Sequence, residues 1–184
     1  MARKKRAVKA KNARKNSRHL QKKQSFFVEK KLLLFVVKFF VIFAVLSALI
    51  ELANLSFFTS FIAFVSASFL NAQWLGNVVF IRNSFFIITN SCTGLVSASI
   101  LASIIFALKK PMLKKKVALF LLGTIILLAA NIPRIIFVLY TAKIGFNAEV
   151  MHELTWFLMS AIVLTIWYYG TKRIEGIKEF NELL

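Results

Sequence analysis

One thiol, one guanidinium and one imidazole are the side chains of this sequence whose types and positions suit joint chemistry. Cys92 is the only cysteine in the 184-residue chain, so it cannot form an intrachain disulfide. A lone cysteine in an apolar helix is most often a small packing residue. The alternative is a nucleophile, because a neighbouring positive charge favours the reactive thiolate. What the fold brings next to Cys92 decides between the two.

Arg134 is the charged residue that packing alone explains least. It lies within a strongly apolar stretch, where an arginine costs about 2.5–3.5 kcal/mol on membrane-insertion scales. Asn131 precedes it by three positions and shares its helix face, and Pro133 removes a backbone hydrogen bond nearby. Two interpretations stay open: a functional cation, or a structural ion pair with Glu51, Glu149 or Glu153.

His152 begins a further apolar stretch, and an imidazole exchanges protons near neutral pH. A histidine at a membrane boundary is also commonly a packing residue. Depth favours a shared site, since Cys92 and Arg134 lie roughly 10 Å and 9 Å below the ends of their apolar stretches. The cysteine, this histidine and the scattered glutamates lack the spacing of a metal site, so we expect no metal and no cofactor.

The elements that hold these groups must be membrane helices. The chain is 59% hydrophobic with a mean hydropathy of +0.72, more apolar than a soluble domain of this length can bury. Its net charge is +18, and 13 of its 25 Lys and Arg residues lie between Arg3 and Lys31. Basic segments of this kind stay on the cytoplasmic side. We therefore expect a multi-pass protein of the cell membrane.

The predicted fold class is an all-α integral membrane protein with four spanning helices and one short interfacial helix on the outer surface. The spans are predicted over residues 32–53, 85–108, 117–140 and 151–169, and the interfacial helix over 56–70. The basic loop 109–116 and both termini are then cytoplasmic, and the site faces outward. Residues 90–94 are poor helix formers and a candidate interruption of the second span.

We expect three parts along the chain: a basic tail over residues 1–31, a helical membrane domain over 32–171 and a second cytoplasmic tail over 172–184. Basic residues gain about 1 kcal/mol each beside anionic lipid headgroups, and they also suit nucleic acid. We favour the bilayer as partner and expect no nucleic acid, because no aromatic platform or nucleic-acid fold follows the tail.

The order Cys92-Thr93-Gly94, then Asn131-x-x-Arg134, then His152, resembles the exosortase/archaeosortase family. The resemblance covers roughly residues 55–169. It implies a membrane-embedded cysteine transpeptidase whose substrate proteins end in a short motif, a transmembrane segment and a basic tail. It also implies roles for the residues: Cys92 as nucleophile, Arg134 as stabiliser of negative charge and His152 as general acid/base, with Asn131, Thr93 and Gly94 in support.

The leading hypothesis is acyl transfer through a Cys92 thioester at the outer membrane face, with either an acceptor molecule or water completing the reaction. The main alternative is a non-enzymatic membrane assembly or interaction subunit that packs through small residues such as Ser97, Ser99, Ala102 and Ser103. A third interpretation is nucleic-acid tethering through residues 3–31. Thiol labelling separates the first two, because a nucleophile reacts near neutral pH and a packed thiol resists.

Overall fold

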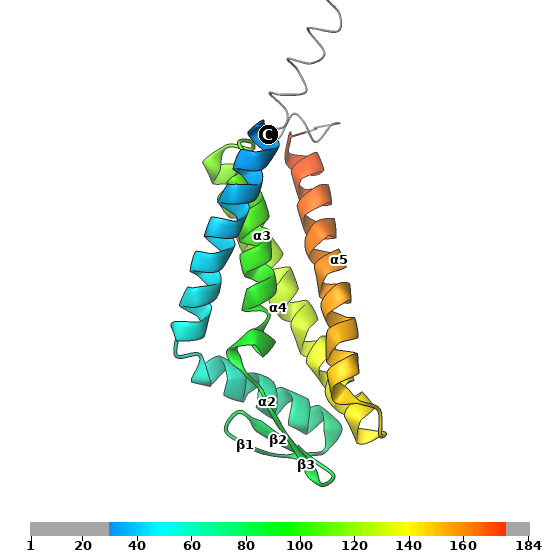
Figure 1. The fold of residues 1–184 in the computed structure, drawn as a ribbon. Helices are drawn as coiled ribbons and strands as arrows, with labels where there is room; N and C mark the ends of the chain where they lie inside the picture. The colour runs from blue at the N-terminus through cyan, green and yellow to red at the C-terminus, as the bar shows by residue number, and fades with distance from the viewer. Residues whose placement is uncertain (1–29, 176–184) are drawn as a thin grey trace, which may run out of the picture.

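The computed structural model describes residues 30–175 as a helical bundle with a small sheet at one end (Figure 1). In chain order its elements are an N-terminal helix (Lys30–Leu52), α2 (Ser56–Leu70), β1 (Gln73–Leu75), β2 (Val78–Ile81), β3 (Ser84–Ile87), the 3-10 turn η1 (Asn90–Thr93), α3 (Leu95–Ala107), α4 (Leu113–Lys143) and α5 (Ala148–Glu175). The N-terminal helix, α3, α4 and α5 run along the bundle. α2 and the three strands form the sheet end, and both described termini lie at the opposite end, called the basic end below.

Among residues 30–175, three helices are long and apolar enough to cross a membrane, so the protein is a multi-pass membrane protein. They are the N-terminal helix, α4 and α5, and they confirm the helices predicted over residues 32–53, 117–140 and 151–169. α4 and α5 extend past both predicted bounds, whereas the N-terminal helix begins two residues earlier and ends one residue earlier than predicted.

The helix predicted over residues 85–108 forms only in its second part, and the interruption considered at residues 90–94 is present. Residues 84–87 pair with β2 instead, and the helix begins only at Leu95. Gly94 adopts a left-handed conformation (φ 85°) that separates η1 from α3. α3 has 13 residues and is about 20 Å long, shorter than the roughly 30 Å hydrocarbon layer. Within a bilayer, non-helical backbone is tolerated where other parts of the protein cover it. Thr93 and Gly94, which precede α3, are buried in this way.

α2 matches the short helix predicted over residues 56–70. Its small side chains, among them Ala63, Ser66 and Ala67, face the protein and are fully buried. Its phenylalanines lie on the other side, and Phe57 is 79% exposed. The antiparallel sheet β1-β2-β3 packs under α2 and was not expected from the sequence.

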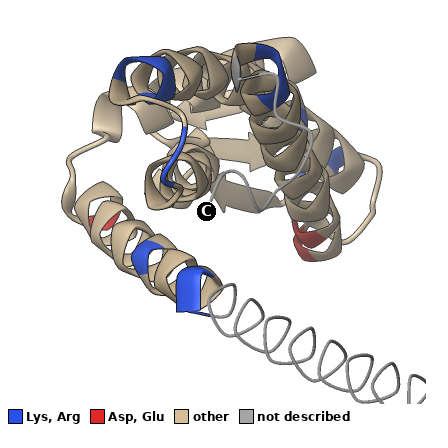
Figure 2. Ribbon diagram, turned by 90° about the horizontal axis from the view of Figure 1, so that it is seen from above, with Lys and Arg blue, Asp and Glu red and all other residues tan. Residues whose placement is uncertain are grey.

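Two apolar clusters hold the described chain together. The bundle cluster joins α3, α4 and α5 around Leu101, Leu127 and Val163, and the second joins α2, the sheet and α4 around Val79 and Leu139. The N-terminal helix contributes only partly buried residues to the bundle cluster and stands apart from α5 when the molecule is seen from above (Figure 2).

The predicted tails over residues 1–31 and 172–184 fall outside the described residues, except for 30–31 and 172–175, which are helical.

Candidate functional site

The 3-10 turn η1 presents Cys92 where the chain leaves the sheet and enters α3. Thr89 is extended (ψ 172°), and its carbonyl oxygen accepts a hydrogen bond from the Cys92 backbone N–H at 2.9 Å. The Thr93 hydroxyl donates to the Asn90 carbonyl at 2.6 Å, which closes the turn. Cys92 itself is half-buried, so its thiol is held in place and still accessible.

Gly94 and Asn131 fit against each other. A Cβ on Gly94 would lie 3.0 Å from Asn131 Cβ and 3.1 Å from Asn131 Cγ, which is closer than ordinary packing. The asparagine is 1% exposed, and its Nδ2 donates to the Cys92 carbonyl oxygen at 2.6 Å. Because glycine lacks a side chain, α4 approaches closely enough for Asn131 to hold the backbone of the cysteine.

Arg134 extends this contact from α4 to α5. Its Nη1 donates to Asn131 Oδ1 at 3.1 Å, its Nε donates to Thr155 Oγ1 at 3.1 Å, and its Nη2 lies 3.3 Å from His152 Nδ1. The arginine is 8% exposed, and Asn131 connects it to the backbone of Cys92. Its described hydrogen-bond partners are Asn131, Thr155 and His152, not one of the three glutamates considered from the sequence. A buried guanidinium with its cationic charge uncompensated by a carboxylate suits an anionic reaction centre.

His152 meets a donor at each ring nitrogen. Trp156 Nε1 donates to His152 Nε2 at 3.1 Å, and Arg134 Nη2 faces Nδ1. Arginine and tryptophan are donors only, whereas a neutral imidazole has one accepting nitrogen. Only one of the two contacts is therefore a hydrogen bond at any moment. The surroundings favour neutral His152, and the ring must release one contact before it gains a proton.

The structure connects Cys92, through its backbone carbonyl, with Asn131, Arg134 and His152, the residues that the sequence singled out. One continuous set of contacts links the Cys92 carbonyl to Asn131, Asn131 to Arg134, and Arg134 to His152. Thr93 and Gly94 shape the turn and its packing, and the Thr93 hydroxyl bonds within the turn. Within residues 30–175, no three side chains among His, Cys, Asp and Glu gather as a metal site would require.

Sequence reasoning missed four residues that hold this arrangement. Thr155 and Trp156 follow His152 by three and four positions, the spacing that places them on its helix face. Thr89 precedes Cys92 by three positions, and its Oγ1 lies 3.5 Å from the sulfur. The Asn90 side-chain amide contacts the carbonyl oxygens of Ile50, Glu51 and Ala53 at 3.0–3.3 Å and ties the N-terminal helix to η1. No local signal predicts this last contact.

Comparison with known proteins agrees with the geometry. The family model described as transmembrane exosortase matches residues 22–169, which include η1, α3, α4 and most of α5. Searches of curated proteins and of solved structures give no match. The match extends over more than half of the chain, and the chain therefore belongs to the transmembrane exosortase family.

Proposed function

We propose that this protein is a membrane-embedded cysteine transpeptidase that cleaves the C-terminal sorting signals of exported proteins and transfers the released acyl group to an acceptor. The observation that carries the proposal is the set of contacts from Cys92 through Asn131 and Arg134 to His152. A buried arginine bonded to neutral groups is costly for packing alone, whereas it suits a reaction in which negative charge develops. A purely structural assembly subunit leaves this combination unexplained.

The proposed topology has four passes, of which α3 forms the short second one, and the site faces outward. Lys and Arg gather at the basic end, at the start of the N-terminal helix, the connection around Lys109 and the end of α5 (Figure 2). Positive charge of this kind marks the cytoplasmic side. The sheet end and Cys92 then face away from the cytoplasm. An impermeant maleimide should label Cys92 in intact cells, and labelling only after the membrane is opened would reverse the orientation.

In the first half of the reaction, the thiol proton passes to His152 and the thiolate attacks a backbone carbonyl carbon of the substrate. The C–S bond forms and the C–N bond breaks, and the leaving nitrogen takes the proton from His152. Arg134 stabilises negative charge, first on the thiolate and then on the oxyanion. It retains N–H groups beyond those directed at Asn131, Thr155 and His152 for this purpose.

In the second half, an acceptor amine or hydroxyl attacks the thioester. Its proton passes to His152 and returns to the sulfur as the C–S bond breaks, so the thiol is restored and the acyl group is joined to the acceptor. Water in place of the acceptor gives hydrolysis. The cleaved protein thus leaves its transmembrane segment and basic tail behind in the membrane.

The test compares cells that carry the wild-type chain with cells that carry Cys92→Ala. Mass spectrometry of membrane and exported proteins should find a set of proteins that lose their C-terminal transmembrane segment only in the wild type. The intact mass of the wild-type chain should also include an adduct that hydroxylamine removes, as expected for a thioester. Identical C-termini in both strains would refute the enzymatic function.

A further inference from the structure

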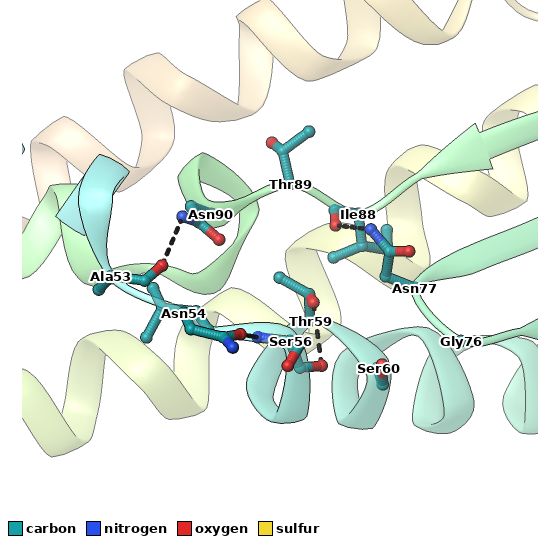
Figure 3. Close-up of a pocket in the computed structure, with 11 residues that line it drawn as sticks. Ala53, Asn54, Ser56, Thr59, Ser60, Gly76, Asn77, Ile88, Thr89 and Asn90 are labelled. Atoms are coloured by element: carbon teal, nitrogen blue, oxygen red, sulfur yellow. Dashed lines mark hydrogen bonds between the residues drawn. The ribbon is translucent and has the colours of Figure 1, made fainter.

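A cavity of about 310 Å³ lies beside the chain that leads into η1, and most of its lining residues carry amide or hydroxyl groups (Figure 3). Three parts of the chain surround it: residues 53–60, where the N-terminal helix ends and α2 begins, the turn at Gly76 and Asn77, and the extended residues 88–90 that lead into η1. Thr89 connects the cavity to the thiol, since it lines the cavity and its Oγ1 lies 3.5 Å from Cys92 Sγ.

The lining restricts what the cavity can hold. None of its 11 residues is charged or aromatic, so it offers neither a counterion for a charged group nor a ring for a sugar to stack on. Amide and hydroxyl side chains line it instead, among them Asn54, Ser60 and Asn77, and such groups both donate and accept. A peptide backbone, with its alternating N–H and C=O groups, needs this mixture.

The shape also suits an extended segment. Ile88 and Thr89 continue from β3 past its last pair with β2, and Ile88 is already bonded to Asn77 through both its N–H and its C=O. Gly76 has no side chain, and nothing lies within 4 Å of where one would begin, so this wall of the cavity is open. The volume is at the lower end of the roughly 300–1,000 Å³ of small-ligand pockets. It therefore fits a short piece of chain.

We infer that this cavity binds a few uncharged residues of an extended substrate peptide immediately before the bond that Cys92 attacks. This inference rests on the proposed function and adds a specificity site to it. The cavity fixes the peptide next to Thr89, whose Oγ1 contacts the Cys92 sulfur, and none of its lining residues is Arg134 or His152, so those two groups stay available for the oxyanion and the leaving group. Peptides with charged residues at these positions are excluded, because the lining has no opposite charge to receive them.

The experiment compares two alkylating reagents on the full chain in detergent. The first is a capped tripeptide chloromethyl ketone made of serine and alanine, and the second is iodoacetamide, which has no peptide part. Cys92 is the only thiol, so the mass of the chain reports its alkylation directly. For each thiol, the rate of alkylation by the peptide reagent is divided by the rate of alkylation by iodoacetamide. This ratio should be about tenfold higher for Cys92 in the wild type than for a small free thiol, because one or two net hydrogen bonds contribute about that factor.

Two substitutions alter the cavity and a third is the matched control. Ser60→Leu fills the cavity. Asn54→Asp adds a charge but keeps an oxygen that can accept the Ser56 N–H, which in the wild type bonds to Asn54 Oδ1 at 3.2 Å. Both should remove most of the tenfold advantage. Ser68→Leu, on an exposed position of the same helix, should retain it.

The outcomes separate this inference from the proposed function. Failure of iodoacetamide to alkylate Cys92 in the wild type would contradict the proposed nucleophile. Alkylation by iodoacetamide without any peptide advantage would overturn the cavity inference alone. So would an advantage that survives both Ser60→Leu and Asn54→Asp, or an equal advantage for tripeptides that carry aspartate or lysine.

Discussion

Substitution of Gly94 by alanine should damage the site more than the backbone strain alone explains. At φ 85° an alanine costs about 1–2 kcal/mol. The new Cβ would also lie 3.0 Å from Asn131 Cβ, so the asparagine must move. That movement weakens the hydrogen bonds from Asn131 to the Cys92 carbonyl and from Arg134 to Asn131, each worth about 0.5–1.5 kcal/mol net. The expected total loss in unfolding free energy is roughly 2–5 kcal/mol.

Gly145→Ala is the matched control. Gly145 also has a positive φ of 102°, but a Cβ there would lie 3.7 Å from its nearest neighbour, Arg82 Nη1, an ordinary contact. This variant should lose only the roughly 1–2 kcal/mol of backbone strain.

Thermal unfolding in detergent, followed by tryptophan fluorescence, measures the stability of both variants, and iodoacetamide measures the reactivity of Cys92. Gly94→Ala should lower stability further than Gly145→Ala and slow alkylation. Gly145→Ala should keep the wild-type alkylation rate. Equal stability losses together with equal alkylation rates would show that the contact between Gly94 and Asn131 does not hold the thiol.

Substitutions at three further positions test the neighbouring contacts. Arg134→Gln should lower substrate turnover by about 10²–10³, because the oxyanion loses a cationic donor, and Arg134→Lys should recover part of that rate; equal turnover in the two variants would rule out a role for the charge. His152→Gln should lower substrate turnover by about 10²–10⁴ while iodoacetamide still reacts, and full turnover would remove His152 from the mechanism. Asn90→Asp should destabilise the chain by about 1–3 kcal/mol in thermal unfolding, because a carboxylate would then face the carbonyl oxygens that end the N-terminal helix. An unfolding midpoint equal to that of the wild type would mean that this contact contributes nothing.

Periodicity and composition were sufficient for most of the helices. Long apolar runs place the N-terminal helix, α4 and α5, since a helix that crosses lipid must be apolar along its length. The same reasoning failed at residues 84–94. Ile88, with Phe86 and Cys92 beside it, packs against residues of α2 and α4, while Phe85 and Ile87 are exposed, and a short apolar run suits a strand as well as a helix. The sheet was therefore beyond reach from the sequence, although α2 was not.

The candidate site likewise has one part that the sequence predicted and another that depended on the tertiary structure. Residue types and their order along three apolar stretches selected Cys92, Arg134 and His152 as candidates. Helical rise converts sequence position into depth for Arg134 in α4, but not for Cys92, because a strand and a turn precede the cysteine. Their partners depend on which helix faces turn toward one another. Asn131 reaches a carbonyl 39 residues away and Arg134 a hydroxyl 21 residues away. The first contact depends on the close approach of α4 that Gly94 allows. The sequence by itself determined which groups enter the site, whereas only the packing of α4 against η1 and α5 decided what each group touches, because packing depends on side chains far apart in the chain.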